Sequence, residues 1–553
     1  MSDITESIPT NVVKSNRRKK LLIALAAVVV FSGAGATAYW ALYGSHIIST
    51  DNAYAAAEVA QMTPAVGGTI SEVLVTDTQA VKKGDVLVKI DQTDARLALA
   101  QAEAELGQAI MVPLTGWLAA RFGPVRVFVW STALFGIFGM LCGLSTSLGM
   151  LVVARIFRGF SGGPLMPLSQ TLLLRIFPKE KAAAAIGLWS MTTLIAPVTG
   201  PILGGYLCDE YSWHWVFMIS TPFAAVCAFI AWNMLKRCEA AAIRTPFDMI
   251  GLVLLVIWVA ALQVMLDEGK NLDWFACDKI VALCIIAGIG FAAFIIWELY
   301  DDHPIVDLRV FRHRGFTVSV TTIGLAFAAF FGINVLIPLW LQNFMGYTAT
   351  IAGLAMAWSG LSSIFVAPMA AQLARKTDPR KLVFFGVIWF GIVTLWRAVA
   401  TTDMGFFDVA MPLIVMGFGM PFIFIPTTDL ALGSVEAHEM DSAAGLMNFL
   451  RTLSGAFATS MITTVWGDQI TRNHAELVGL ADQDLSVRAM LDGSGAPLDV
   501  VNQVIDYLIV QQSVMLATNQ MMVAIGAIVI VAALITWLSP KPARVVEPGT
   551  GGH

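Results

Sequence analysis

The sequence predicts an all-α polytopic membrane protein. Of its 553 residues, 57% are hydrophobic and 13% are charged, and the mean hydropathy is +0.73. A soluble domain carries about 25% charged residues, so the composition excludes an ordinary soluble protein. Uncharged runs long enough to cross the hydrocarbon core of a bilayer, which takes about 20 residues, recur along the chain.

One of these runs, residues 186–207, has features beyond those of a simple anchor. Gly200 and Gly204 lie four residues apart with Gly205 beside them, and such a small-residue face lets another helix approach closely. Pro197 and Pro201 have the same spacing, and each removes a helical hydrogen bond and bends the axis. We therefore expect a kinked helix at a seam between helices. The alternative is an ordinary span, since Gly and Pro are common in membrane helices.

The first 43 residues predict a cytoplasmic arm followed by a transmembrane anchor. Residues 1–20 are polar and end in Arg-Arg-Lys-Lys, whereas residues 21–43 carry no charge. Basic residues beside a span stay in the cytoplasm, which places the arm there. Small residues at 36–38 make a removable signal peptide the alternative. The apolar run continues to Tyr43, which favours an uncleaved anchor.

Residues 44–106 predict a small β-rich segment beyond the anchor. Alternating valines at 73 and 75, and again at 86 and 88, predict two strands, and Lys83-Gly84-Asp85 predicts a turn between them. This stretch resembles the first half of the lipoyl-like domain of EmrA/HlyD-type membrane fusion proteins. The resemblance implies that residues 44–106 are periplasmic, that residues 92–106 begin a helical hairpin, and that no covalent cofactor is attached.

From about residue 108 onward the chain resembles the EmrB type of drug:proton antiporter, a fourteen-helix branch of the major facilitator superfamily. GWLAARFG at residues 116–123, followed by Arg126, matches the superfamily's signature loop between its second and third helices. Ala120 stands where the family has an acidic residue. APVTGPILGG at residues 196–205 matches its antiporter motif. The resemblance implies a major facilitator helical bundle over residues 107–541, followed by a cytoplasmic tail at residues 542–553. The motif residues expected to serve conformational change are Gly116, Arg121, Gly123, Arg126, Pro197, Gly200, Pro201, Gly204 and Gly205.

We expect this bundle to be truncated at its N-terminus. The apolar run at residues 107–120 is shorter than a full span, and Glu103 and Glu105 precede it. No stretch matches the family's first-helix motif Asp-x-Thr-Ile-Val-Asn-Val-Ala, and the anchor contains no carboxylate. A carboxylate in a low-dielectric cavity lets protonation bias alternating access. Its absence therefore bears directly on proton coupling.

The remaining chain predicts twelve further spans whose basic loops alternate with less basic ones. Placing every basic loop in the cytoplasm gives a consistent topology in the bacterial inner membrane if residues 107–120 also cross. The polar segment at about 468–515 is then outside the membrane and partly helical. The spans are expected near residues 127–146, 150–175, 185–207, 214–235, 249–266, 279–298, 316–341, 350–371, 382–400, 409–430, 442–466 and 519–538.

Polar residues inside spans are the candidates for proton coupling and transport, because they are costly there. Arg155 and Arg158 share one helix face, and the resemblance makes Arg155 the superfamily's fourth-helix arginine. The alternative is that both snorkel to water. Asn448 and Arg451 also lie three residues apart and either line a cavity or form interhelical hydrogen bonds. Asn334 is a similar case.

The predicted function is multidrug efflux across the inner membrane by proton-driven antiport of hydrophobic compounds. The alternative is a non-transporting, membrane-anchored adaptor remnant that binds efflux partners, as the half lipoyl-like segment and the missing carboxylate indicate. The expected partners are drug-like substrates, protons, the lipid bilayer and, through the resemblance, a membrane fusion protein and an outer-membrane channel, but no nucleic acid. The sequence has no phosphate loop, zinc signature or nucleophile elbow, and its six cysteines lack metal-like spacing, so we expect neither an enzyme nor a cofactor or metal.

Overall fold

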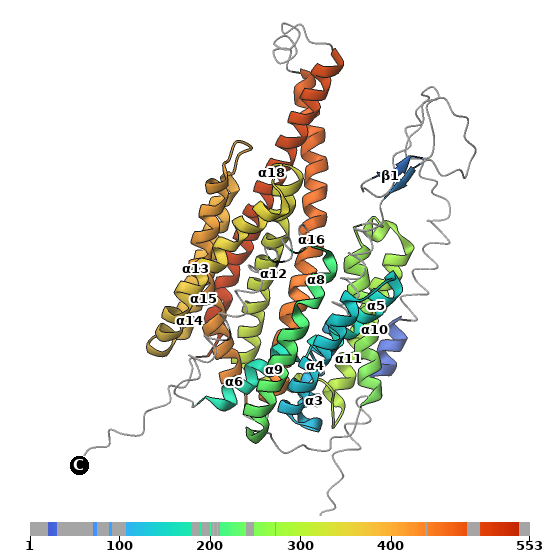
Figure 1. The fold of residues 1–553 in the computed structure, drawn as a ribbon, viewed down its shortest axis with the longest axis vertical. Helices are drawn as coiled ribbons and strands as arrows, with labels where there is room; N and C mark the ends of the chain where they lie inside the picture. The colour runs from blue at the N-terminus through green and yellow to red at the C-terminus, as the bar shows by residue number, and fades with distance from the viewer. Residues whose placement is uncertain are drawn as a thin grey trace, which may run out of the picture.

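The computed structural model is almost entirely helical (Figure 1). It describes residues 20–29, 70–73, 88–90, 107–177, 189, 200, 203, 207, 211–238, 248–270, 272–436, 439–483 and 498–540. Several predictions lie outside these residues: the arm at 1–19, the anchor beyond Val29, the turn at 83–85, the start of a hairpin at 92–106, and the tail at 542–553. The described part of the anchor, Lys20–Val29, is helical.

Two short strands pair in the segment that precedes the helical bundle. β1 (Ile70–Val73) and β2 (Val88–Ile90) run antiparallel, with Ile70 opposite Ile90 and Val73 opposite Val88. Two strands are therefore present in this segment, but β1 ends at Val73 and β2 begins at Val88, and Val75 and Val86 lie outside the described residues. A two-stranded hairpin occurs in many folds and does not by itself establish a lipoyl-like domain.

The helices form an N-terminal group, a pair that follows it, and a C-terminal group. The N-terminal group contains α3 (Thr115–Phe122), α4 (Pro124–Gly143), α5 (Leu148–Gly162), α6 (Leu165–Ile176), α8 (Trp213–Met218) and α9 (Ser220–Leu235). The pair is α10 (Met249–Glu268) and α11 (Asp278–Tyr300). The C-terminal group contains α12 (Arg314–Asn343), α13 (Ala349–Lys376), α14 (Pro379–Trp396), α15 (Phe406–Gly433), α16 (Met440–Gln483) and α18 (Leu498–Ile535). The 3-10 turns are η3 (Lys236–Cys238), η4 (Trp274–Ala276), η5 (Leu308–Arg312), η6 (Arg397–Val399) and η7 (Thr536–Leu538).

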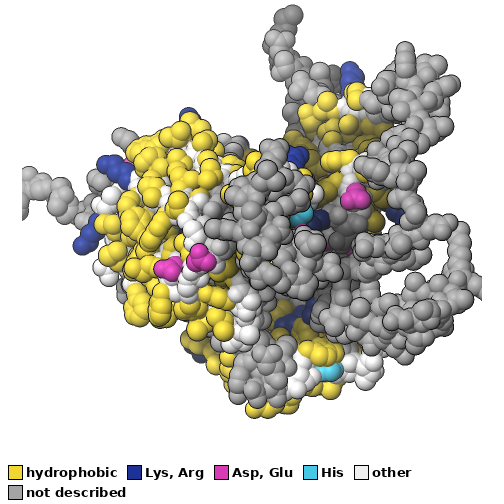
Figure 2. All heavy atoms as spheres, turned by 90° about the horizontal axis from the view of Figure 1, so that it is seen from above, with side chains coloured by type: hydrophobic (Ala, Val, Ile, Leu, Met, Phe, Trp, Pro, Cys, Tyr) yellow, Lys and Arg dark blue, Asp and Glu magenta, His cyan; other side chains and the backbone are white. Residues whose placement is uncertain are grey.

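Within the described residues, nine helices are long and apolar enough to cross a membrane. They coincide with nine of the predicted spans. Their bounds are Pro124–Gly143, Trp213–Leu235, Met249–Glu268, Asp278–Tyr300, Arg314–Asn343, Thr350–Ala374, Pro379–Val399, Phe406–Gly433 and Val504–Leu538. Many large hydrophobic side chains of these helices are exposed, as lipid contact requires. Hydrophobic side chains also make up much of the described surface seen from above (Figure 2).

The three other predicted spans differ from the structure in instructive ways. The span at 150–175 is two helices, because Pro164 lacks a backbone N–H and the chain breaks between α5 and α6. The span at 442–466 lies within α16, which is too polar overall to count among the nine. Of the span at 185–207, only four residues are described, and all four are helical.

The short segment expected to be the tail of a helix is itself interrupted. Residues 107–111 are helical, residues 112–114 form a turn, and α3 follows. Gly163 lies against this segment so closely that a Cβ there would be 2.7 Å from Met111 Cβ. The break before α6 and the turn before α3 therefore pack against each other.

A sequence repeat relates the start of α4 to the start of α14. PLTGWLAARFGPVR at residues 113–126 and PMAAQLARKTDPRK at residues 368–381 share both prolines, a Leu-Ala pair and two basic positions at identical spacing. Pro124 and Pro379 each occupy the first helical position, where proline is favoured. Gly123 precedes the first with φ of 90°, which only glycine adopts readily. Asp378 precedes the second, and its carboxylate accepts a hydrogen bond from the Arg380 N–H at 3.1 Å.

α15 is the most buried of the nine spans, with 78% of its apolar window inside the protein. Its close neighbour is α13, and the two cross at Gly417. A Cβ added at Gly417 would overlap both Ser362 Oγ and the Ser359 carbonyl oxygen. The crossing therefore requires glycine, because the obstructing group on α13 includes backbone.

We predict that Gly417→Ala lowers the free energy of unfolding by about 1–3 kcal/mol, the usual cost of overpacking. The midpoint of thermal unfolding of the purified protein in detergent measures this. Gly433→Ala is the matched control on the same helix, because nothing lies within 4 Å of its Cβ position. Equal midpoints for the two variants would contradict the tight crossing.

Candidate functional site

The candidate site lies where α16 passes between the two helical groups. The first half of α16 contacts α3 and α6 on one side and α12 on the other, and Figure 1 shows it running between the groups. Asn448 and Arg451 are on this part of α16, one turn apart, and both are buried. The structure therefore places these two predicted residues at the interface between the halves.

An amide pair joins the halves at this level. Asn448 Nδ2 donates to Gln170 Oε1 on α6 at 3.3 Å and to the Ala444 carbonyl oxygen at 2.8 Å. Asn448 Oδ1 and Gln170 Nε2 are buried and find no partner within the part of the chain that the structure describes. The interface thus holds one acceptor and one donor that are available to a polar group entering between the halves. Of the two roles expected for Asn448, the interhelical hydrogen bond is the one observed.

Arg451 is a buried cation held by aromatic rings. Its side chain is 6% exposed, and its guanidinium carbon lies 4.4 Å from the Phe327 ring centroid on α12 and 5.7 Å from that of Trp189. Cation–π contacts of this kind are worth about 2 kcal/mol when desolvated. No carboxylate of the described residues forms an ion pair with Arg451. Burying a guanidinium group without a carboxylate partner costs free energy. Arg451 can therefore interact favourably with an anionic or polar group that enters the interface.

The surroundings of Arg451 combine aromatic surface with few polar groups. Phe327 packs against Phe424 of α15 with ring centroids 4.6 Å apart, and Phe330 adds an edge-on contact to Phe424 at 6.2 Å. Trp189 Nε1 donates to Ser169 Oγ on α6 at 2.9 Å. An apolar lining with a small number of placed polar groups is typical of small-molecule sites.

Asn334 is not joined to this cluster. It lies one turn beyond Phe330 on α12, and its Nδ2 donates to the Phe330 carbonyl oxygen of its own helix at 2.8 Å. It is half-buried, and none of its described hydrogen bonds reaches α16. Its predicted role in coupling therefore has no interhelical contact to support it.

Arg155 and Arg158 form a second, separate cluster inside the N-terminal group. The Arg158 guanidinium lies between Phe135 of α4 and Phe217 of α8, 4.5 and 5.2 Å from the ring centroids, and its Nη2 donates to Ser220 Oγ at 3.3 Å. Arg155 lies 4.6 Å from the same Phe217 ring. Aromatic faces hold both guanidinium groups against neighbouring helices, whereas snorkelling would direct them to water. Among the described side chains, neither arginine has an ion-pair partner.

The two halves are pressed together at the end of the bundle that carries the basic loops. A Cβ at Gly116 of α3 would lie 2.5 Å from Ser442 Oγ and 2.9 Å from Ser442 Cα. Arg175 at the end of α6 pairs with Asp441 at the start of α16. Gly445 continues the contact, since its Cβ position is 3.1 Å from the Val112 carbonyl oxygen. These contacts close this end of the interface beside the Asn448–Gln170 pair.

The other predicted motif residues have different surroundings. Arg121 lies over the Trp117 ring at 5.9 Å, and Arg126 is exposed at the start of α4. Gly200 is helical, and its Cβ position has no described atom within 4 Å. Pro197, Pro201, Gly204 and Gly205 lie outside the described residues.

A charged cluster near the same end links the start of α12 to the start of α16. Glu439 is 4% exposed, accepts from Arg312 Nη2 at 2.9 Å, and lies 2.8 Å from His313 Nε2. Burial raises the pKa of the Glu439 carboxyl, but the hydrogen bond from His313, the Glu436 N–H and the charge of Arg312 together hold it below its ordinary value. An ionised carboxylate only accepts, so His313 Nε2 is the donor.

Among the described residues, His313, Glu436 and Glu439 form a group whose ligand atoms lie within 4.8 Å of one another, close enough to hold a metal ion. Arg312 contacts both carboxylates, at 3.4 Å from Glu436 and 2.9 Å from Glu439. The guanidinium thus supplies the positive charge that a metal ion would supply. The group is an ion-pair cluster that ties two helices together.

The comparison with known proteins fixes the family. The model of the Major Facilitator Superfamily matches residues 25–459, well over half of the chain. The chain belongs to this superfamily. It is 37% identical over 501 residues to the multidrug export protein EmrB of Escherichia coli K12, covering 87% of this chain and 98% of EmrB. It is 40% identical over 421 residues to EmrB of Haemophilus influenzae, covering 73% of this chain and 82% of that protein. It is 38% identical over 459 residues to the fatty acid resistance protein FarB of Neisseria gonorrhoeae, covering 81% and 89%.

Membership of the superfamily makes this chain a polytopic membrane transporter of the EmrB type. These three relatives are named as export or resistance proteins, which gives no support to a non-transporting adaptor. The N-terminal and C-terminal groups of helices described above are the two halves of such a fold. Asn448 and Arg451 of α16 lie between them. The predicted fusion to an EmrA/HlyD-type segment receives no support from these matches.

The sequence interpretation missed several residues of the interface. Gln170 and Trp189 complete the surroundings of Asn448 and Arg451, and Asp441 pairs with Arg175 across the halves. Arg397, which is buried at the end of α14, was missed as well. Gln170 and Arg397 lie inside predicted spans, so their cost in the bilayer was the signal that could have found them. Asp441 had no such signal, since its partner is distant in sequence.

We predict that Gly116→Ala prevents full closure at the basic-loop end, because the new methyl group meets the Ser442 backbone. Modification by a membrane-impermeant maleimide of a cysteine placed in this seam should rise severalfold in inside-out vesicles. Gly149→Ala is the control, because nothing lies within 4 Å of that Cβ position. Unchanged labelling in Gly116→Ala would contradict the closed contact.

We predict a pH-dependent contribution of Glu439 to stability. Because its pKa is lowered on folding, its ionised form stabilises the protein above its ordinary pKa of 4.5, and this contribution is lost as the pH falls below that value. Glu439→Gln should lower the free energy of unfolding by about 1–2 kcal/mol at neutral pH, and the difference should shrink in acid. Thermal unfolding against pH measures this, with exposed Glu476→Gln as the control. A difference that does not change with pH would contradict the assignment.

Proposed function

We propose that this chain exports hydrophobic, drug-like compounds across the bacterial inner membrane in exchange for protons, by alternating access between its two halves. The observation that carries the proposal is the buried Arg451, without a carboxylate partner among the described residues, amid aromatic rings and an incompletely paired amide pair at the interface. The relatives named as multidrug export proteins support the same substrate class.

The substrate site of this proposal lies between the halves at the level of Arg451. Phe327 and Trp189 supply flat apolar surfaces for a hydrophobic compound. Asn448 Oδ1 and Gln170 Nε2, which have no partner among the described residues, orient its polar groups. The site is adaptable because stacking on aromatic rings tolerates many shapes. A broad range of substrates follows from this lining.

Access from the basic-loop end requires the contacts there to separate. Opening breaks the Arg175–Asp441 ion pair and moves Ser442 away from Gly116. We assign Asp441 the role of the carboxylate whose protonation favours this opening, because a neutral Asp441 no longer attracts Arg175. This assignment answers the absence of the family's first-helix carboxylate motif from the sequence.

Arg155 and Arg158 act in this proposal as a fixed positive charge in the N-terminal half. The two guanidinium groups lie on one helix face and repel an incoming proton. Because both contact Phe217 of α8, the position of the proton is coupled to the position of the helices around Phe217. Asn334 has a lesser role, lining α12 beyond Phe330.

The organisation of the front of the chain is also part of the proposal. We infer a cytoplasmic arm at 1–20, an anchor at 21–43, and a periplasmic segment at 44–106. The transporter follows at 107–541, with a cytoplasmic tail at 542–553. The antiparallel β1–β2 pair supports a β-rich periplasmic segment, and the basic loops support the orientation. A membrane fusion protein and an outer-membrane channel are the expected protein partners.

We predict energy-dependent efflux of a fluorescent hydrophobic dye from cells that express this chain, abolished by a protonophore. Arg451→Gln should reduce the initial rate roughly ten- to hundredfold, since losing one buried charged contact costs about 1.5–3 kcal/mol. Arg155→Ala should abolish the proton-coupled efflux. Asp441→Asn should leave residual efflux that no longer depends on the proton gradient.

Exposed Arg472→Gln is the matched control, because it removes one arginine from α16 outside the interface. Membrane insertion of every variant is checked by fractionation. If the wild-type protein is inserted in the membrane but gives no efflux, export is refuted and the result favours the non-transporting adaptor.

A further inference from the structure

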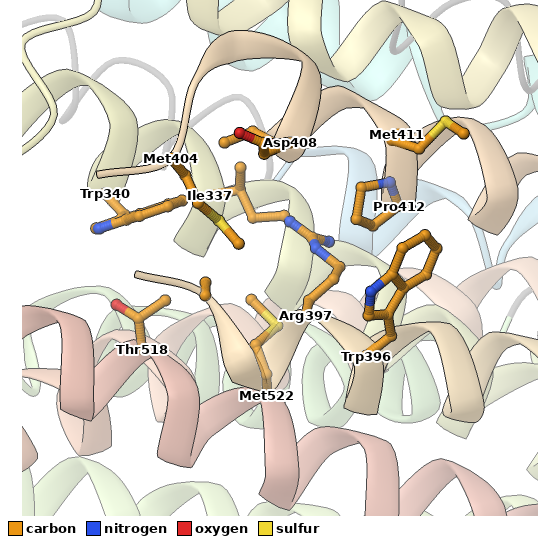
Figure 3. Close-up of a pocket in the computed structure, with 12 residues that line it drawn as sticks. Ile337, Trp340, Trp396, Arg397, Met404, Asp408, Met411, Pro412, Thr518 and Met522 are labelled. Atoms are coloured by element: carbon orange, nitrogen blue, oxygen red, sulfur yellow. The ribbon is translucent and has the colours of Figure 1, made fainter. Parts of the chain in front are cut away.

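A cavity of about 190 Å³ lies within the C-terminal group at the end opposite the basic loops. It is enclosed by the last turns of α12 and α14, the start of α15 and the middle of α18 (Figure 3). Trp340, Met404 and Met522 are among the apolar side chains that line it. The cavity is separate from the Arg451 cluster, with which it shares no lining residue.

Arg397 supplies the positive charge of this cavity. It is 8% exposed, and Figure 3 shows its guanidinium group in the midst of the lining side chains. Among the residues that the structure describes, its Nη1 is buried without a hydrogen-bond partner and no carboxylate forms an ion pair with Arg397. Thr518 supplies a hydroxyl group to the lining, but this group already donates to the Val514 carbonyl oxygen and accepts from Trp466. An arginine enclosed in this way calls for an anionic partner.

The mouth of the cavity carries a negative charge. Asp408 is exposed in the first turn of α15, and its carboxylate accepts from the Gly405 N–H at 3.0 Å. Asp408 is the other charged residue in the lining. A ligand that meets both Arg397 and Asp408 therefore needs an anionic group inside and a cationic group at the mouth.

The cavity also opens at the depth of a membrane interface. Trp396 and Met411, which line it, are 47% and 54% exposed, and Val399 and Phe407 beside them are exposed as well. Exposed aromatic residues at helix ends are typical of the headgroup region. The surface around the mouth is therefore where acyl chains would lie, with a headgroup directed inward.

We propose that this cavity binds the headgroup of a zwitterionic phospholipid of the phosphatidylethanolamine type. The phosphate pairs with Arg397, the ammonium group faces Asp408, and the acyl chains follow the exposed side chains of Trp396 and Met411. The volume suits such a headgroup, since a cavity of about 150 Å³ holds a benzene molecule. The bound lipid supplies the countercharge that Arg397 lacks and ties α14 to α15.

Native mass spectrometry of the purified, delipidated full-length protein tests the proposal with dioctanoyl phosphatidylethanolamine as the probe. Wild-type protein should retain this lipid, and Arg397→Gln should weaken the apparent affinity roughly tenfold, as expected for losing a charged hydrogen bond. Asp408→Asn should remove the preference for phosphatidylethanolamine over dioctanoyl phosphatidylglycerol. Arg472→Gln, exposed on α16, should behave as wild type.

Two further arms keep the test decisive. Ala400→Phe fills the cavity while retaining Arg397 and should weaken lipid binding as strongly, which covers the case in which Arg397→Gln does not fold. Octanoate and inorganic phosphate test whether a free anion is the natural occupant. Equal retention of phosphatidylethanolamine by wild type and Arg397→Gln, or tighter binding of octanoate or phosphate than of the lipid, would overturn the proposal. None of these readouts depends on transport.

Discussion

The close approach of α16 to α3 and α6 is the contact on which the functional interpretation depends. Gly116 allows the Ser442 backbone to approach, and Arg175 and Asp441 pair beside it. With the ends drawn together, Asn448 can reach Gln170 from the opposite half. A side chain at Gly116 would meet the Ser442 backbone, so the absence of a Cβ at this position allows the close contact between α3 and α16.

Buried arginine is the recurrent device of this chain. The half-buried Arg155 and Arg158 and the buried Arg451 lie on aromatic rings without an ion-pair partner among the described residues, and the buried Arg397 lies in a cavity. An aromatic ring stabilises a guanidinium group less than a neighbouring carboxylate does. Each of these arginines therefore keeps part of its interaction energy available for another partner, which suits a protein whose contacts must change during a transport cycle. The paired Arg380, held by Asp378 and the Ser539 carbonyl oxygen, shows the contrasting structural use.

Hydropathy predicted most of the fold because the bilayer imposes it. Nine predicted spans coincide with apolar helices, since a crossing segment needs about 20 apolar residues whatever its neighbours are. The break at Pro164 and the long, more polar α16 were less predictable, because both depend on what packs around them. α16 runs well beyond the span predicted at 442–466, and with α18 it makes the polar segment partly helical, as expected.

The candidate site was only half predictable for a related reason. Asn448 and Arg451 are visible in the sequence as polar residues in a span, but their partners Gln170 and Trp189 come from the other half of the chain. Sequence spacing finds residues that share one helix face and says nothing of which helices meet. The signature loop was informative because its glycine has a steric role, and Gly116 lies at the tightest contact of α3 with α16.

The absence of the family's first-helix carboxylate motif does not by itself exclude proton coupling. Coupling requires an acid whose protonation changes the relative free energy of two conformations, and that acid can be at any contact that differs between them. In the proposed cycle Asp441 is this acid, because its ion pair with Arg175 joins the halves at the closed end and would break when that end opens. An acid in a substrate cavity couples by competing with substrate, whereas an acid in a gate couples by favouring opening. Protonation of Asp441, which lies at the basic-loop end, would not change the substrate site at Arg451 itself. Substrate affinity would then depend on pH only because the fraction of protein open at that end depends on pH.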